Sequence, residues 1–161
     1  MGKHENPAVP LYERDFHARS QEQAEKLRAR AHNDIDWENV AEEIDSLGRS
    51  DKREIRNGLE VLLRHLLKWE FQPEKRRSGW HSTIVEQRSQ LHYLIDESPS
   101  LRKFPQSQLQ SMYQLARIKA QNETGLPLST FPEPSPYSIS QVLAEQFLPG
   151  APLVRDEGYF D

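Results

Sequence analysis

Three ionisable residues interrupt apolar faces in the sequence, and these are the positions where chemistry is first expected. Arg88 lies within the apolar face of a predicted helix, one turn from Ile84. His65 lies at the edge of a longer apolar stripe, and Asp51 fills a gap in that stripe. A charge inside a helical bundle is costly unless it is paired and hydrogen-bonded. Each position therefore needs a structural partner or a ligand.

The partner of Arg88 is predicted from the hairpin that two helices would form. Folding the chain back at residues 74–75 places Arg88 level with about residue 61, and within about one turn of Gly58 and His65. Gly58, which has no side chain, would leave room for a guanidinium group. The carboxylates that could pair with it are Asp51, Glu54 and Asp15.

Two interpretations of this cluster are open. In the first, Arg88 and an acid form a structural ion pair that fixes the register of the helices, since such pairs resemble functional sites. In the second, a polar pocket binds an anionic or carboxylate ligand, with His65 as proton donor or acceptor. The candidate catalytic residues are then His65, Arg88, Asp51 and Glu54, and enzymatic activity stays undecided.

Sequence motifs give no support for a known catalytic or metal-binding template. The chain has no cysteine, no P-loop, no Gly-x-Gly-x-x-Gly motif and no Gly-x-Ser-x-Gly elbow. The di-iron pattern needs Glu-x-x-His, and no histidine has a glutamate three residues before it. We therefore expect neither a metal nor a cofactor.

A basic cluster with interleaved aromatic residues raises the possibility of nucleic-acid binding. Two glutamates dilute the cluster, and the chain has a net charge of −4, against the overall basicity typical of nucleic-acid binders. We expect Trp69 and Trp80 to pack against each other where the hairpin closes. The cluster consists of Arg64, Lys68, Lys75, Arg76 and Arg77, interleaved with Trp69, Phe71 and Trp80.

Helical periodicity runs through most of the chain. Apolar residues from Trp37 to Trp69 recur every three or four positions, except for one longer step after Leu47, and stay on one helical face. Gly48 marks a point where this helix could kink or divide. Helices are predicted over residues 11–31, 36–72, 79–96 and 105–123, with a short one from 138 to 149 after a proline-rich strap. The prediction is an all-α antiparallel bundle of four main helices with a short C-terminal helix.

The length of 161 residues fits one domain, with its core over about residues 11–149 and loose tails at 1–10 and 150–161. No uncharged apolar run is long enough to cross a bilayer, so no membrane partner is expected. The absence of cysteine and of an apolar leader favours a cytoplasmic location.

Many short segments, in order, resemble an uncharacterised bacterial family known as domain of unknown function 29. They read YERDFHA, IDWENVAEEIDSLGRSDKREIRNGLEVLLRHLLKWEFQPEKR, W-x-x-T-I-x-E-Q-R, SPSL, ETGLPLSTFPE and PYSISQVL. The resemblance covers residues 11–149 and implies a helical bundle. It implies no activity, cofactor or catalytic residue.

Three functional hypotheses follow. The first is a non-enzymatic module that binds a protein partner or forms a homo-oligomer, favoured by the long helix and the aromatic, proline-rich strap. The alternative is a small-ligand or metal-dependent enzyme with a polar pocket around His65 and Arg88. The third is a protein associated with nucleic acid.

Overall fold

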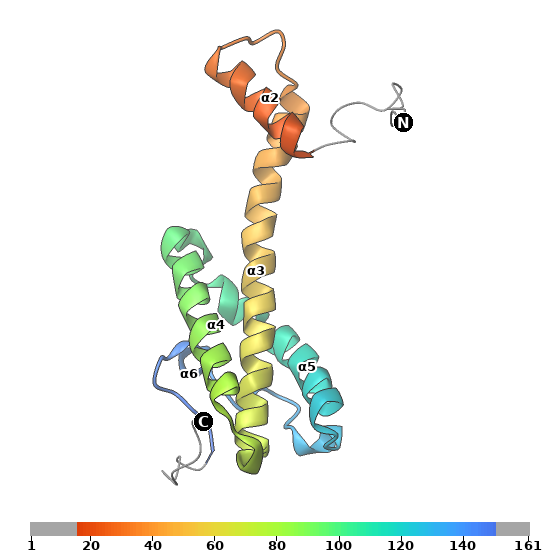
Figure 1. The fold of residues 1–161 in the computed structure, drawn as a ribbon, viewed down its shortest axis with the longest axis vertical. Coiled ribbons are helices and arrows are strands. Elements are labelled where there is room, and N and C mark those ends of the chain that lie inside the picture. Colours follow the sequence, from red (N-terminus) through yellow and green to blue (C-terminus); the bar gives the residue numbers. More distant parts are fainter. Residues whose placement is uncertain (1–15, 151–161) are drawn as a thin grey trace, which may run out of the picture. The chain divides into compact units, whose positions relative to one another are not determined.

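All regular structure in the described part of the chain is helical. A computed structural model describes residues 16–150, with side chains from residue 21 onward. The prediction of an all-α bundle is confirmed, and none of the described residues forms a strand. The helices are α2 (Phe16–Arg28), α3 (Trp37–Phe71), α4 (Ser78–Glu97), α5 (Phe104–Thr124) and α6 (Ile139–Leu143), with short 3-10 turns at Pro73–Lys75, Pro99–Leu101 and Leu128–Thr130 (Figure 1).

The chain divides into two compact units, with the boundary between Arg49 and Ser50. The first unit contains α2 and the start of α3, and the second contains the rest of α3 and α4 to α6. That the whole chain forms one domain stays a prediction. The predicted tails at residues 1–10 and from 151 onward lie outside the described residues.

In the first unit, polar contacts fix the start of α3. Asp36 caps the helix, because its Oδ1 accepts a hydrogen bond from the backbone N–H of Asn39 at 3.2 Å. The Gln23 side chain of α2 in turn accepts from the Asp36 N–H at 3.1 Å. The Trp37 indole stacks on His32, with ring centroids 6.2 Å apart, and donates to its carbonyl. Asp36 is thus the N-cap of α3.

α3 is a single helix, and Gly48 does not divide it. From Ile55 to Trp69 its apolar stripe is buried, as predicted. Before that point the prediction holds for the buried Val40 and is wrong for Trp37, Ile44 and Leu47, which are 54%, 64% and 65% exposed.

The length of α4 explains why the stripe is buried only in part. α4 returns along α3 from the turn near residues 74–75, and it ends at Glu97. A helix of 20 residues is about 30 Å long, so it reaches back only to about residue 52 of α3. The apolar periodicity of α3 therefore continues beyond the segment that α4 covers.

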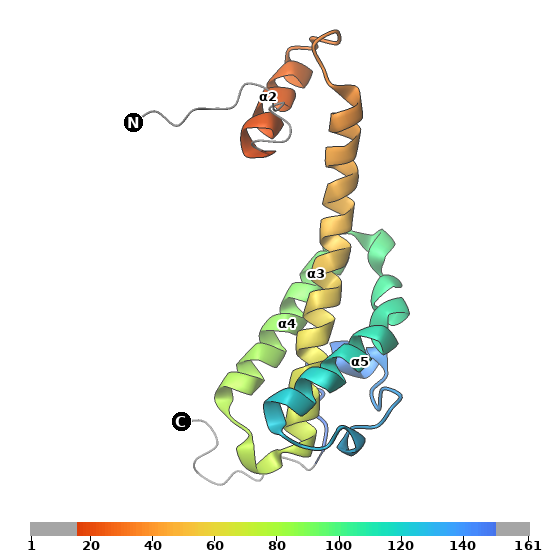
Figure 2. The same cartoon turned by 90° about the vertical axis from the view of Figure 1, so that its right-hand side faces the viewer.

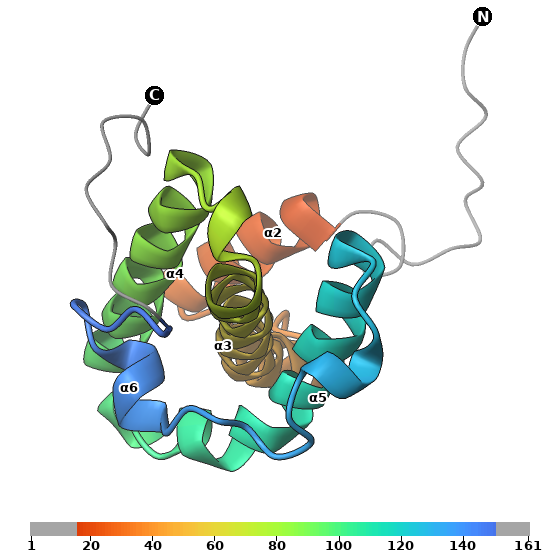
Figure 3. The ribbon, with the colours of Figure 1, turned by 90° about the horizontal axis from the view of Figure 1, so that it is seen from below.

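The second unit is a bundle built around the C-terminal half of α3. α4 runs antiparallel along one side of α3 and α5 lies on another (Figure 2). α6 closes the bundle and contacts both α4 and α5 (Figure 3). The core comprises residues of α3, α4, α5, α6 and the segment between α5 and α6, from Ile55 to Val142.

The predicted register of the α3–α4 hairpin is confirmed, but the neighbour of Gly58 is not the one expected. A Cβ atom built on Gly58 would lie 3.1 Å from Leu91 Cδ2 and 3.3 Å from Gln87 Oε1. These side chains, and not the guanidinium group of Arg88, fill the space that the glycine leaves.

Two further helix ends are also fixed by local caps. Gly125 ends α5 in the left-handed conformation, with φ of 71°, which favours glycine. Ser138 and Gln141 form a reciprocal capping box at the start of α6. No helix among the described residues has the length and apolar character needed to cross a membrane.

Candidate functional site

Arg88 binds the C-terminal strap, which we define as residues 126–149, including α6. The residue is only 2% exposed. Its Nε donates to the Val142 carbonyl at 2.8 Å, and its two terminal nitrogens donate to the carbonyls of Glu145 at 3.3 Å and Phe147 at 2.7 Å. All three acceptors lie at or just beyond the C-terminal end of α6, where carbonyls lack helical partners.

The predicted acid partner of Arg88 is therefore wrong, although the structural interpretation of the residue gains support. Its described partners are three main-chain carbonyl oxygens, and not the carboxylate of Asp51 or Glu54. Asp15, the third candidate acid, lies outside the described residues. Burial lowers the pKa of the Arg88 guanidinium from 12.5, a group that stays charged in proteins.

Arg117 on α5 holds the other end of the strap in the same way, and the sequence analysis missed it. Its Nε donates to the Phe131 carbonyl at 2.9 Å, and a terminal nitrogen donates to the Leu128 carbonyl at 3.2 Å. The signal was present in the sequence, because Arg117 interrupts an apolar face between Tyr113 and Ala120, as Arg88 interrupts its own.

Two tyrosines complete the attachment of the strap. Tyr113 donates its hydroxyl proton to the Pro132 carbonyl at 2.6 Å, and burial raises its pKa to about 12. Tyr137, within the strap, donates to the carboxylate of Glu70 on α3. Burial, and then the hydrogen bond to Glu70, raises the pKa of Tyr137 well above its ordinary value. Both hydroxyls therefore stay neutral and act as hydrogen-bond donors.

His65 makes a local contact and is half-buried. Its Nδ1–H donates to the Val61 carbonyl one turn earlier, at 2.8 Å. Burial is the largest influence on its pKa and lowers it from 6.5; the hydrogen bond to Val61 opposes this shift, and the charges of Lys68 and Arg64 add to it. His65 is thus a neutral imidazole at physiological pH, and its Nδ1 is engaged by the backbone.

Glu54 lines the cavity between α3 and α4, which has a volume of about 520 Å³. Its neighbours there include Asn57 from α3 and Gln87, Gln90 and Tyr93 from α4. The lining offers one carboxylate and several amides over an apolar floor of Val61, Leu91 and Leu94. Neither His65 nor Arg88 lines this cavity, and Asp51 is half-buried outside it.

Two members of the predicted basic cluster form ion pairs with acidic side chains. Arg64 and Lys68 both pair with Glu123 of α5, the latter at 2.9 Å. Arg64 and Lys119 each lie 3.2 Å from a carboxylate oxygen of Glu60. Apart from the Arg64–Glu60 pair, which lies within α3, these pairs join α3 to α5, so they are structural.

The two tryptophans of that cluster are buried. Trp69 and Trp80 are 2% and 6% exposed, which removes them as surfaces on which bases could stack. The ring of Trp69 lies 6.0 Å from that of His81 between centroids, and among the described residues it makes no ring contact with Trp80, contrary to expectation. Trp80 instead receives two cations, with Lys68 Nζ 4.7 Å and the Arg77 guanidinium 5.3 Å from its ring centroid.

Comparison with known proteins identifies the family. The family model described as domain of unknown function DUF29 matches residues 11–148. The chain belongs to the DUF29 family. No curated protein and no solved structure matches the chain.

In this DUF29 chain, the four candidate residues do not converge. Arg88 binds the strap, His65 binds its own helix, and Glu54 lines the cavity between α3 and α4. Among the described residues, no three histidine or acidic side chains lie close enough together to hold a metal ion. What the arrangement does bring together is a set of arginine and tyrosine donors on the carbonyls of the strap.

Proposed function

We propose that this DUF29 protein is a non-enzymatic interaction module that forms a dimer through the exposed apolar face of α3. This face, the α3 face, consists of Trp37, Ile44 and Leu47. Its exposure is the observation that carries the proposal, because more than half of the surface of each of these side chains is open. Fully burying one large apolar side chain stabilises by roughly 1.5–3 kcal/mol.

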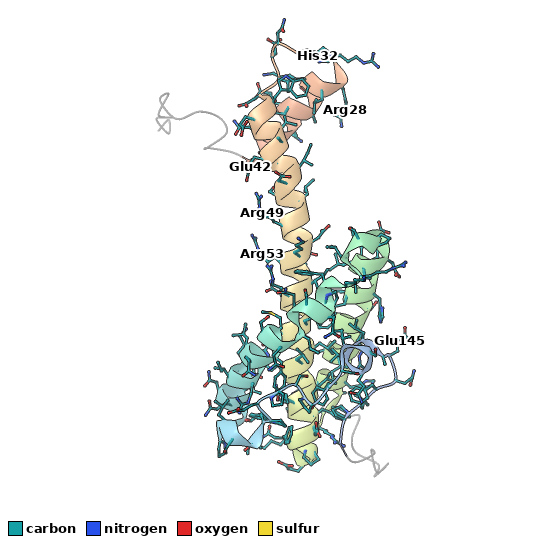
Figure 4. All side chains as sticks on the ribbon, turned by 180° about the vertical axis from the view of Figure 1, so that it is seen from behind. Arg28, His32, Glu42, Arg49, Arg53 and Glu145 are labelled. Atoms are coloured by element: carbon teal, nitrogen blue, oxygen red, sulfur yellow. The ribbon has the colours of Figure 1, made fainter. Side chains whose placement is uncertain are left out.

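The spacing of these residues suits a helical partner. With the largely buried Val40, the positions 37, 40, 44 and 47 follow the three-four repeat of paired helices. Glu42 and Arg49 form a salt bridge on the opposite side of this segment (Figure 4). The segment is thus amphipathic, with polar residues on one side of the helix and apolar residues on the other.

The occupant that fits this face is a second copy of the chain. In an antiparallel pair with a two-fold axis between residues 44 and 47, Ile44 of each copy meets Leu47 of the other. Gly48 lies beside the α3 face and would let the two copies approach closely there, because even a Cβ on this residue would have no atom within 4 Å. The segment 37–49 is only about 20 Å long, so we expect a reversible dimer of small interface.

The enzymatic alternative has less support. It needed Arg88 and His65 to face a ligand together, whereas the guanidinium group of Arg88 already donates to three carbonyls. The cytoplasmic location expected from the composition is kept as part of the present proposal.

The test is light scattering coupled to size exclusion on the full chain over a wide concentration range. We expect the wild type to shift from monomer to dimer with concentration, and the double variant Ile44→Ser, Leu47→Ser to stay monomeric. Ile118→Ser is the matched control, since Ile118 on α5 is 50% exposed and lies outside the α3 face. A wild type that is monomeric throughout, or a double variant that dimerises equally well, would contradict the proposal.

A further inference from the structure

A second cavity of the DUF29 chain lies at the turn between α3 and α4 and is lined mainly by cationic side chains. We call it the basic recess. Its volume is about 420 Å³, which lies within the range of small-ligand sites. It shares no residue with the α3 face or with the lining of the cavity that contains Glu54. The lining residues are Lys68, Gln72, Glu74, Lys75, Arg76, Arg77, Trp80 and Glu123.

Positive charge is concentrated in the basic recess, although the chain as a whole is negatively charged. Four cationic side chains line it against two carboxylates, whereas the chain as a whole has a net charge of −4. One carboxylate, Glu123, is already neutralised by Lys68 and Arg64. Burial alone would raise the pKa of Glu123, but Lys68 and Arg64 outweigh it and lower the pKa. The recess therefore keeps a local excess of positive charge.

The inner wall of the recess is preorganised. Lys68, Gln72 and Arg76 are 8%, 5% and 8% exposed, so polar side chains are held at the wall by the fold. Arg76 donates its Nε–H to the Trp69 carbonyl at 2.8 Å, and its guanidinium lies 5.0 Å from the Trp69 ring centroid. These side chains are held in place by contacts within the fold, so the wall keeps its shape and its charge when a ligand binds.

The rim of the recess is formed by Arg77 and the first turn of α4. Arg77 is the N-cap residue, and its side chain makes no capping hydrogen bond. The first turn has no acidic residue, so the positive end of the helix dipole is uncompensated within it. A Cβ on Gly79 would meet no atom within 4 Å, which leaves this turn open to an approaching group.

We propose that the basic recess binds the phosphate group of a small molecule. A phosphate group accepts hydrogen bonds on several oxygens and carries up to two negative charges, which suits guanidinium and ammonium donors around one recess. The exposed Lys75 and Arg77 supply cations at the rim for the ligand, and the buried wall adds fixed positive charge behind them. A nucleic acid is less suited, because Trp69 and Trp80 are buried and offer bases no surface for stacking.

The test is calorimetric titration of the full chain with inorganic phosphate at constant ionic strength, with chloride as the reference anion. We expect saturable binding in the wild type. The double variant Lys75→Gln, Arg77→Gln changes two exposed residues, so the fold is kept, and we expect its affinity for phosphate to fall at least tenfold. The control Lys52→Gln, Arg53→Gln removes the same charge from exposed positions of α3 outside the recess, and its affinity should stay within twofold of wild type.

Further titrations identify the source of the phosphate group. Phenyl phosphate binding more tightly than inorganic phosphate indicates an organic phosphate ester, and equal affinity indicates free phosphate; both support the recess. No phosphate response beyond that of chloride overturns the proposal. So does an equal loss of affinity in the control, because bulk charge would then explain the binding. Binding of a single-stranded oligonucleotide without any response to inorganic phosphate also overturns it.

Discussion

Arg88 and Arg117 solve a problem that the strap creates for the fold. Prolines keep much of the strap out of regular structure, so its carbonyls lack the partners that a helix or sheet would provide. A buried carbonyl without a partner costs free energy comparable to a lost hydrogen bond. A guanidinium group has five N–H donors in a rigid plane, so one side chain can serve several carbonyls at once. The charge is tolerated in the interior because hydrogen bonds satisfy it.

Replacing Arg88 by methionine should therefore destabilise the protein strongly. Three hydrogen bonds from a charged donor are lost, and the carbonyls of Val142, Glu145 and Phe147 lose their partner. We expect the free energy of unfolding to fall by about 2–4 kcal/mol, measured by urea denaturation. The free energy of unfolding of Arg88→Lys should lie between those of Arg88→Met and wild type. An ammonium group keeps the charge but lacks the planar set of donors of a guanidinium group.

Arg53→Met is the control for this substitution, since Arg53 is exposed on α3 and the same side-chain change should alter stability by less than about 0.5 kcal/mol. An Arg88→Met protein as stable as wild type, or more stable, would show that the guanidinium group is not needed for the fold. The hypothesis of a ligand contact at Arg88 would then gain support.

At the level of single residues, the sequence shows where a buried charge occurs but not what satisfies it. Arg88 stands out because it interrupts an apolar helical face, and periodicity suffices to detect that. Its partners are backbone carbonyls more than fifty residues later in the chain, in a segment without periodic pattern. Carboxylates were the partners visible in the sequence, so an ion pair was predicted where main-chain oxygens are found.

At the level of helices, the glycines of α3 illustrate two different local constraints. Gly48 has open space around its Cα, so the missing side chain serves no packing role within the chain. Gly58 lies against Leu91 of α4, where an added Cβ would be 3.1 Å from Leu91 Cδ2. The two positions look alike in the sequence, and only the neighbouring helix distinguishes them.

Alanine at Gly48 and at Gly125 should change stability in opposite directions. Gly48 lies inside a helix, where alanine gains about 0.5–1 kcal/mol over glycine. Gly125 has a φ of 71°, and a left-handed conformation costs a non-glycine residue about 1–2 kcal/mol. We expect thermal unfolding of dilute, monomeric protein to show a higher Tm for Gly48→Ala and a lower one for Gly125→Ala. A shift of the same sign in both variants would contradict these local assignments.

Helix identity and helix ends were predictable because both depend on nearby residues. The caps at Asp36, Gly125 and the Ser138–Gln141 pair are local patterns of three or four residues. The burial of α3 was only half predictable, because it depends on the length of another helix. Trp37, Ile44 and Leu47 continue the stripe of Ile55 and its successors, but α4 ends before it can cover them.

At the level of the whole molecule, the core of the bundle draws only on the second unit. Every described residue of the core cluster falls between Ile55 and Val142, after the boundary at residues 49 and 50. The ion pairs of Glu60 and Glu123, and the arginine contacts to the strap, also fall within the second unit. The determinants of the bundle are thus separate in the sequence from the α3 face.

A chain of residues 50–161 should consequently fold without the first unit. We expect helical circular dichroism with a cooperative thermal transition, because the buried apolar residues and the strap contacts are all retained. The shortened chain lacks the α3 face, so it should stay monomeric at concentrations where the full chain dimerises. It keeps every residue that lines the basic recess, so its affinity for phosphate should match that of the full chain. A shortened chain without a cooperative transition would show that the first unit is required for folding and would favour a single domain. A folded one that still dimerises would place the dimer interface elsewhere than on the α3 face.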